Sequence, residues 1–214
     1  MPELGLGSHT FNDLFGATPN AWDSSVSAGG SSGGAAVALA QRMLPVADGS
    51  DFMGSLRNPA GWNHVFGMRP SQGRVPRPSL PDVFIAQLGT EGPMARSVSD
   101  MAMLLSTQAG YDARAPLSIQ ESGAAFAQSL DASMNGKRVG WLGNLNGYLP
   151  MESGVMEVCQ DALKVLETTG CSVDTTHLGM QRADFLGMLC IAILFMTIAT
   201  PISAISVPAS GPMI

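Results

Sequence analysis

Hydrophobic residues recur at helical spacing in three segments of the chain. From Gly33, the run "GGAAVALAQRM" sets alanine, valine and leucine among strong helix formers and stops before a proline. The segment "SVSDMAMLLSTQAG" is amphipathic, with Ser97 or Ser99 as the N-cap and Gly110 as its stop. The third segment, "MESGVMEVCQDALKVLETTG", carries acidic residues early and Gly170 at its end. The pattern therefore predicts three helices.

Short apolar runs between turn residues predict the strands. Residues 44–47, "LPVA", are typical of a short buried strand, which we expect to end in a turn at Asp48 and Gly49. The runs "KRVGWLG" and "CSVDTTHL", residues 137–143 and 171–178, flank the third helix. Strand, helix and strand in this order indicate a βαβ unit with two parallel strands. The predicted fold class is therefore α/β.

Two further segments show no sustained period. Residues 1–27 are polar and are expected to form a surface loop. Residues 51–76 are rich in glycine, proline and asparagine, and we expect them to hold only a short helix near Leu56 to Trp62 and a short strand near Phe66. The chain between the predicted helices is therefore dominated by loops.

Composition narrows the class of protein. Of the 214 residues 45% are apolar and 13% are charged, which favours a compact globule over a disordered chain. The net charge of -6 and the 11 scattered lysines and arginines exclude nucleic acid as a partner. An uncharged run from Phe185 to Val207 is long enough to cross a bilayer. It breaks at Pro201 and no basic cluster follows, so buried core is favoured over a membrane segment.

Cysteine and histidine spacing gives no metal or disulfide pattern. Cys159, Cys171 and Cys190 form no CxxC pair and leave one thiol over from any disulfide. The first sixteen residues lack the basic and apolar regions of an export signal, so we expect a cytoplasmic protein with free thiols. The histidines also lack the spacing of metal ligands or of a Ser-His-Asp triad. They are His9, His64 and His177. We therefore predict no metal and no cofactor.

The segment "SAGGSSGGAAVALA", residues 27–40, joins a glycine-serine loop directly to the first predicted helix. By itself it fits an anion-binding loop, a flexible linker or a catalytic loop. It lacks the Gly-Lys-Ser/Thr and GxGxxG forms of phosphate-binding loops, and its glycines enter a helix where a linker would join domains. A second element, "DGSDFMGSLRNPAG", follows at residues 48–61 and brings Ser55 after Gly54.

Four motifs follow in a fixed order: "AGGSSGGAAVALA", "DGSDFMGSLRNPAG", "GMRPSQGRVP" and "LGTEGPMARSVSD". Together they resemble the amidase signature family, and the resemblance covers roughly residues 1–180. It implies a mixed sheet flanked by helices, incomplete at both ends. It also implies one amidase signature domain over residues 1–214, with a divergent apolar segment at 181–214.

The resemblance implies an amide hydrolase that works through a Ser, cis-Ser, Lys arrangement. Ser55 takes the place of the nucleophile, and Ser31 that of the bridging serine, which follows a cis peptide bond. In the family the bridging hydroxyl relays a proton between the nucleophile and a neutral lysine. The backbone N–H groups of four residues match the oxyanion hole, which stabilises charge on the tetrahedral intermediate. These residues are Phe52, Met53, Gly54 and Ser55.

Three more residues are expected to support the site. Asp51 and Arg57 match positions that brace the nucleophile loop through a buried ion pair, and Ser32 is expected to support the loop. Gly54 is expected to lack a side chain so that the substrate carbonyl can approach.

The catalytic lysine that the resemblance implies lies upstream of the first serine loop, and a long C-terminal remainder is implied as well. Residues 1–214 are therefore expected to be part of a longer amidase fold. The two lysines of the sequence, Lys137 and Lys164, are predicted to be solvated.

The predicted function is hydrolysis of the C–N bond of a small-molecule carboxylic amide through a serine acyl-enzyme. The alternatives are a protein like the A subunit of an amidotransferase and a non-catalytic amidase remnant. The large apolar residues Phe52 and Met53 favour an amidase that works by itself with an apolar pocket. No nucleic acid or membrane partner is expected, and a homodimer is a candidate assembly.

Overall fold

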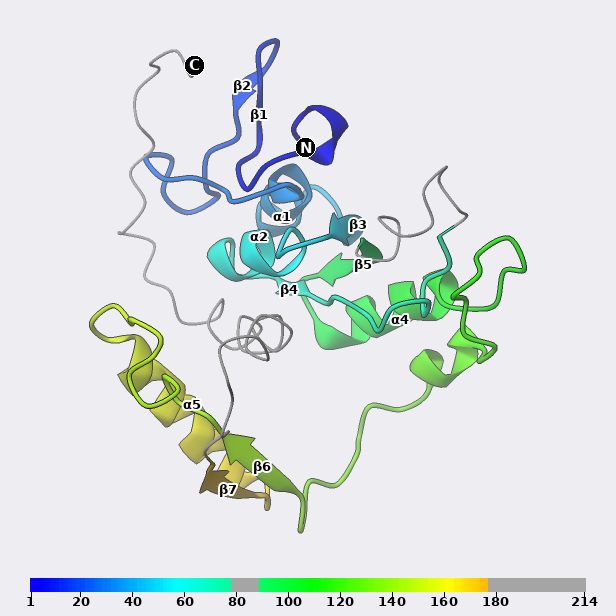
Figure 1. Cartoon of the computed structure of the whole chain (residues 1–214). Helices are drawn as coiled ribbons and strands as arrows, with labels where there is room; N and C mark the ends of the chain where they lie inside the picture. Colours follow the sequence, from blue (N-terminus) through cyan, green and yellow to red (C-terminus); the bar gives the residue numbers. More distant parts are fainter. Residues whose placement is uncertain (78–88, 177–214) are drawn as a thin grey trace. The chain divides into compact units, whose positions relative to one another are not determined.

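The computed structural model describes residues 1–77 and 89–176, and the chain forms two compact units (Figure 1). The N-terminal unit extends to Gln128, and the C-terminal unit begins at Ser129. The expectations for 181–214 and 185–207 lie outside the described residues. Within the described ranges, no helix has the length and apolar character needed to cross a membrane.

In the described part of the N-terminal unit, the main sheet has three strands in the order β3-β5-β4. They are β3 (Val46–Asp51), β5 (Thr90–Ala95) and β4 (Phe66–Gly67), and both pairs are antiparallel. The short strand expected near Phe66 is confirmed. The central strand β5, however, was not predicted, because "TEGPMA" has neither alternation nor β-branched residues beyond its threonine.

The turn expected at Asp48 and Gly49 is wrong, because β3 runs through both residues. They pair with Pro93 and Gly92 of β5. The glycine is needed for packing: a Cβ at Gly49 would lie 2.7 Å from the Ser32 Oγ. Gly49 therefore marks a close approach of the serine loop to the strand.

Among the described residues, three α-helices pack around this sheet. Figure 1 shows α1 (Gly33–Ala40) and α2 (Arg57–Trp62) on one side and α4 (Val98–Gln108) on the other. The short 3-10 helix η2 (Gly123–Ala127) packs against α4. The Ser97 side chain accepts a hydrogen bond from the Asp100 N–H, which confirms the predicted N-cap of α4.

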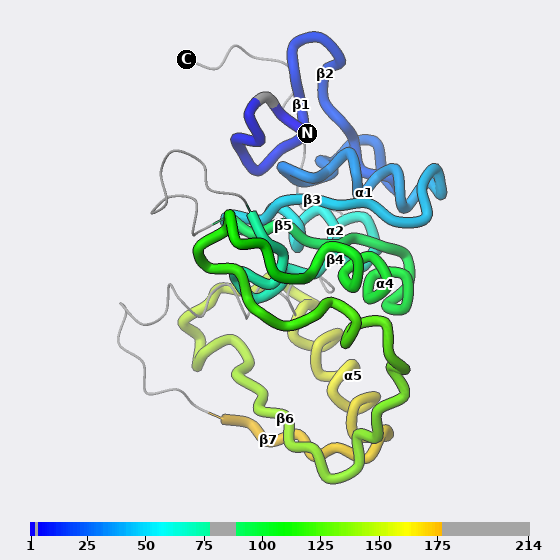
Figure 2. Tube along the Cα trace, turned by 90° about the vertical axis from the view of Figure 1, so that its right-hand side faces the viewer, coloured from blue at the N-terminus to red at the C-terminus, as the bar shows by residue number. Residues whose placement is uncertain are grey.

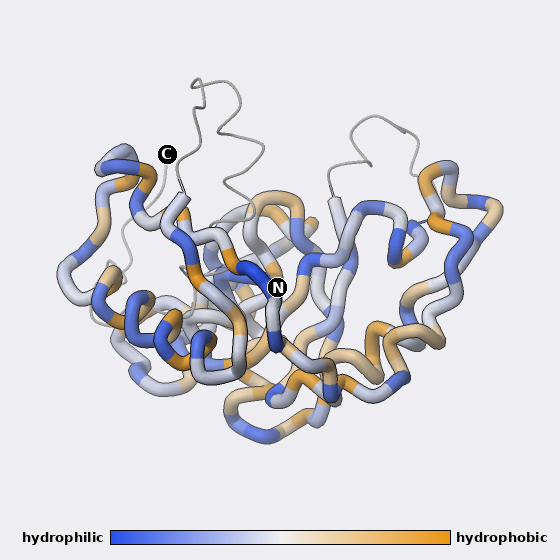
Figure 3. The backbone as a smooth tube through the Cα atoms, turned by 90° about the horizontal axis from the view of Figure 1, so that it is seen from below, coloured by the Kyte–Doolittle hydropathy of each residue, from blue (hydrophilic) through white to orange (hydrophobic). Residues whose placement is uncertain are grey.

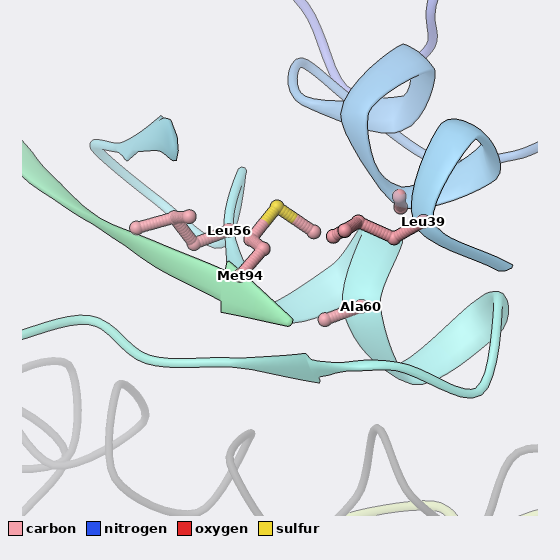
Figure 4. Close-up of a cluster of buried hydrophobic side chains, with 5 residues drawn as sticks. Leu39, Leu56, Ala60 and Met94 are labelled. Atoms are coloured by element: carbon pink, nitrogen blue, oxygen red, sulfur yellow. The ribbon is translucent and has the colours of Figure 1, made fainter. Parts of the chain in front are cut away.

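A small apolar core joins α1, α2 and β5 (Figure 4). It consists of Ala36 and Leu39 from α1, Leu56 and Ala60 around α2, and Met94 from β5, all of them buried. Leu56 directly follows Ser55, so the candidate nucleophile is attached to the core through its neighbour in the chain.

The expectation of a surface loop over residues 1–27 is wrong in two respects. A 3-10 turn, η1 (Glu3–Gly5), precedes a hairpin of β1 (Phe11–Asn12) and β2 (Gly16–Ala17), which lie side by side in Figure 2. Thr10 and Asn20 are also buried, because their side chains bond to main-chain groups of later segments. Burial of a single polar residue through hydrogen bonds to the main chain produces no hydrophobic period, so the sequence pattern did not predict it.

The C-terminal unit is the predicted βαβ unit. Strands β6 (Arg138–Trp141) and β7 (Ser172–Thr175) pair in parallel, with α5 (Val155–Thr168) between them in the chain and packed against β7. Hydrophilic and hydrophobic residues alternate along α5, the helix at the lower left of Figure 3. The periodicity therefore predicted this unit correctly, apart from a few residues at the element ends.

Candidate active site

The glycine-serine loop lies directly on the backbone of an earlier segment. A Cβ at Gly30 would lie 2.6 Å from the His9 backbone nitrogen, so only glycine fits there without displacement. The peptide bond between Gly30 and Ser31 is cis, as the resemblance implies for this serine. Ser31 is 1% exposed and Ser32 3%. The loop is thus a packed part of the N-terminal unit.

Thr10 holds this loop by side-chain hydrogen bonds to the main chain. Its hydroxyl donates to the Gly29 carbonyl oxygen at 2.9 Å and accepts from the Gly33 N–H at 3.0 Å. The second bond satisfies a donor at the start of α1. Sequence reasoning missed Thr10, because a lone threonine in a polar segment carries no periodic signal.

The second loop connects β3 to α2 and is organised around the carboxylate of Asp51, which is fully buried. Arg57 binds it with two donors, Nε to Oδ2 at 2.8 Å and Nη2 to Oδ1 at 3.0 Å. The N–H groups of Gly54 and Leu56 also donate to it, at 2.7 and 3.3 Å. The expected buried ion pair of Asp51 and Arg57 is therefore present.

The pKa of the Asp51 carboxyl reflects two opposing causes. Burial raises the pKa because it removes water from the carboxylate. The hydrogen bond and positive charge of Arg57, together with the N–H donors of Gly54 and Leu56, outweigh burial and leave the pKa below its usual value. Asp51 is thus a carboxylate at neutral pH, and its charge holds the loop that carries Ser55.

Hydrogen bonds at Ser32 join the two loops. Its N–H donates to the Ser55 carbonyl oxygen at 3.3 Å. Its hydroxyl lies between the main-chain groups of Ser50, accepting from the N–H at 3.4 Å and approaching the carbonyl oxygen at 3.5 Å. Ser31, one residue earlier, is therefore held beside the segment that carries Ser55.

The hydroxyls of Ser31 and Ser55 have no hydrogen-bond partner among residues 1–77 and 89–176. Ser55 is half-buried, whereas Ser31 is almost fully buried. Neither hydroxyl is thus committed to another group in the described part of the chain.

The four N–H groups expected in the oxyanion hole differ in their bonding. The Gly54 N–H donates to Asp51, so it is engaged within the loop. The N–H groups of Phe52, Met53 and Ser55 donate to no other residue in the described part of the chain. Gly54 itself has φ +125°, and a Cβ there would lie 2.8 Å from the side-chain nitrogen Nδ2 of Asn58. Backbone conformation and Asn58 thus require glycine at this position.

The other titratable residues contribute little to this site. Lys137 and Lys164 are exposed, as predicted, and Lys164 pairs with Asp161 at 2.7 Å. The His9 ring nitrogen Nδ1 bonds to the Ser27 hydroxyl at 3.0 Å, at the first residue of the glycine-serine segment. In the part of the chain that the structure describes, no group of three or more histidine, cysteine or acidic side chains could hold a metal ion.

Comparisons with known proteins match the sequence of this chain to one family. The amidase family model matches residues 1–200. The A subunit of glutamyl-tRNA(Gln) amidotransferase from Pseudomonas putida (strain F1) is 36% identical over 184 residues, and the one from Coxiella burnetii (strain Dugway 5J108-111) is 37% identical over 185. Each alignment covers 86% of this chain and 38% of the relative, so the chain spans well under half of the length of these relatives.

Solved structures of amidases also resemble this chain. A bacterial aryl acylamidase of the amidase signature family superposes with a TM-score of 0.77 and 33% identity, over 88% of this chain and 39% of that one. The peptide amidase of Stenotrophomonas maltophilia superposes with a TM-score of 0.64 and 32% identity, over 81% of this chain and 36% of that one. These likenesses confirm the predicted α/β fold class.

Proposed function

The chain belongs to the amidase family, and on that premise we propose that it carries the two-serine part of a centre that hydrolyses carboxylic amides. Ser55 is the nucleophile and Ser31 the bridging serine. The observation that carries the proposal is the bond from the Ser32 N–H to the Ser55 carbonyl oxygen, which joins the two loops next to two hydroxyls without described partners.

The reaction that this arrangement supports is acyl transfer. The Ser55 Oγ attacks the amide carbonyl carbon, the C–N bond breaks, and the proton of Ser55 passes through the Ser31 hydroxyl toward the leaving amine or ammonia. Water then cleaves the acyl-enzyme to the carboxylic acid and restores the serine. The N–H groups of Phe52, Met53 and Ser55 are the donors for the developing oxyanion, while Gly54 supports the loop through Asp51.

Labelling with a fluorophosphonate, which reacts with activated serines, tests this proposal. We expect the chain to be labelled, Ser55→Ala to abolish labelling, and Ser31→Ala to slow it by about 10² to 10⁴-fold because the proton relay is lost. Ser106→Ala on α4 is the matched control, because the hydroxyl of this half-buried serine bonds only to the Met103 carbonyl oxygen of its own helix. Labelling that survives Ser55→Ala would overturn the nucleophile. A folded chain that is not labelled would overturn the activity and favour the non-catalytic alternative.

A second candidate function has support of its own from the relatives. Those of Pseudomonas putida and Coxiella burnetii are A subunits of glutamyl-tRNA(Gln) amidotransferases, so the alternative to an amidase that works by itself is a component of such an amidotransferase. The likeness to an aryl acylamidase and the exposed apolar side chains of Phe52 and Met53 favour the amidase. Ammonia release from glutamine compared with arylamine release from an acyl anilide distinguishes the two.

A further inference from the structure

We propose that Arg69 is a positioning residue for the oxyanion donors: it holds the carbonyl of Asp51 and thereby orients and polarises the N–H of Phe52. The inference rests on the proposed function, because it concerns the same nucleophile loop. It adds a residue from the segment that follows β4, none of whose residues has a role in the site described above.

Arg69 contacts the nucleophile loop at Asp51. Its Nε–H donates to the Asp51 carbonyl oxygen at 3.3 Å, and the same nitrogen lies 3.5 Å from Oδ1. The carboxylate already has two shorter bonds from Arg57. To this loop Arg69 therefore adds a bond to the main chain, at the residue where β3 ends and the loop begins.

Peptide geometry transmits this contact to Phe52. The bond between Asp51 and Phe52 is trans, so its C=O and N–H lie in one plane and point in opposite directions. The bond from Arg69, together with the pairing of Asp51 with Thr90 of β5, therefore fixes the direction of the Phe52 N–H. A hydrogen bond to the carbonyl also polarises the peptide group and makes its N–H a stronger donor. That N–H is one of the three with no partner in the described part of the chain.

The position of Arg69 is set by close packing on the central strand. The Met68 N–H donates to the Pro93 carbonyl oxygen at 3.1 Å, which extends the pairing of β4 with β5 by one residue. A Cβ at Gly92 would collide with the Met68 carbonyl oxygen and would lie 2.7 Å from the Pro70 Cδ. Gly92 thus lets residues 68–70 cross β5 closely enough for Arg69 to reach the end of β3.

The charge of Arg69 acts in the same direction as its hydrogen bond. Arg57 and Arg69 both approach the Asp51 carboxylate, so their positive charges lie beside the loop that carries Ser55. Arg69 is 25% exposed and Arg57 2%. Positive charge beside the N–H donors of this loop favours an oxyanion.

NMR of the whole chain tests the contact without relying on activity. In Arg69→Gln we expect the Asp51 carbonyl 13C and the Phe52 amide 15N resonances to shift, because both nuclei belong to the peptide group that loses its donor. Arg74→Gln is the matched control: Arg74 lies five residues later, pairs with Glu121 at 2.7 Å and faces the Phe126 ring. It should leave both resonances in place. Unchanged resonances in Arg69→Gln would overturn the proposal.

The rate of fluorophosphonate labelling at Ser55 then tests the consequence. We expect Arg69→Gln to slow labelling by about tenfold or more, Arg69→Lys to recover part of the rate by keeping the charge, and Arg74→Gln to match the parent chain. An Arg69→Gln chain that is folded and labelled at the parent rate contradicts the proposal. If the parent chain is not labelled at all, the proposed function fails, whereas the resonances still decide whether Arg69 orients the peptide.

Discussion

The two units of the chain place their charged side chains differently. In the N-terminal unit, Asp51 and Arg57 form an ion pair with 0% and 2% of their side chains exposed. In the C-terminal unit, Arg138 and Asp174 meet at 3.3 Å with 82% and 57% exposed. One pair is part of the interior next to the candidate nucleophile, while the other is solvated.

This contrast shows where the site depends on the fold. A buried charge needs a partner and further hydrogen bonds, and Asp51 has both from the loop that carries Ser55. The βαβ unit folds around an amphipathic helix and has no such cluster in its described residues. Polar substitutions should therefore be severe in the N-terminal unit and mild in the C-terminal one.

The largest effect is expected from Arg57→Met. It leaves the Asp51 carboxylate buried with its bidentate partner gone, and breaking a buried pair from one side costs about 3–5 kcal/mol. The free energy of unfolding, measured by urea denaturation, should fall by that amount. Labelling of Ser55 should fall with it, because the Asp51 carboxylate that holds the Ser55 loop loses its Arg57 partner.

The double variant Asp51→Asn/Arg57→Met controls this prediction. Removing the carboxylate charge as well should recover part of the lost stability, since no unpaired charge remains in the interior. If Arg57→Met lowers the free energy of unfolding by less than about 1 kcal/mol, the pair behaves like an exposed one and the contrast between the units is lost.

A smaller effect is expected at the glycine-serine loop from Gly33→Ala. The new Cβ would collide with the Thr10 hydroxyl and lie 3.0 Å from the Thr10 Cβ, so we expect a loss of about 1–3 kcal/mol in urea denaturation. Gly34→Ala is the matched control one residue later, where the nearest atom is the Met1 nitrogen at 3.7 Å. Alanine should be neutral there or stabilise α1 by about 0.5–1 kcal/mol. Equal losses in both variants would mean that the loop is not packed on Thr10.

The two units also differ in how well their elements could be predicted from the sequence. The C-terminal unit was predicted correctly because α5 has a clear helical period between two apolar strands. In the N-terminal unit, β5 escaped prediction because Pro93 sits in its middle. The strand tolerates a residue without an N–H there, and the Pro93 carbonyl accepts from Met68.

The candidate site was predicted in part, and for a different reason. The residues Ser31, Ser55, Asp51 and Arg57 came from ordered motifs, and the structure brings their loops together. Thr10 was missed because it acts through main-chain groups distant in sequence, which neither a period nor a short motif encodes. Arg69 lies within the motif "GMRPSQGRVP", but its role was missed because it contacts a main-chain group 18 residues earlier in the chain. The occupied N–H of Gly54 was missed for the same reason, because it depends on the position of the Asp51 carboxylate.

The smallest effect is expected from Arg138→Gln in the C-terminal unit. Arg138 reaches Asp174, which lies two residues beyond its register partner Ser172 on the neighbouring strand. Exposed pairs of this kind contribute less than about 1 kcal/mol, and salt screens them. Urea denaturation should therefore give a change within about 0.5 kcal/mol of the parent chain, and the difference should shrink further at high ionic strength. If Arg138→Gln lowered the free energy of unfolding as much as Arg57→Met, the C-terminal unit would also depend on a tightly held ion pair. The contrast between the two units would then no longer support placing the site in the N-terminal unit.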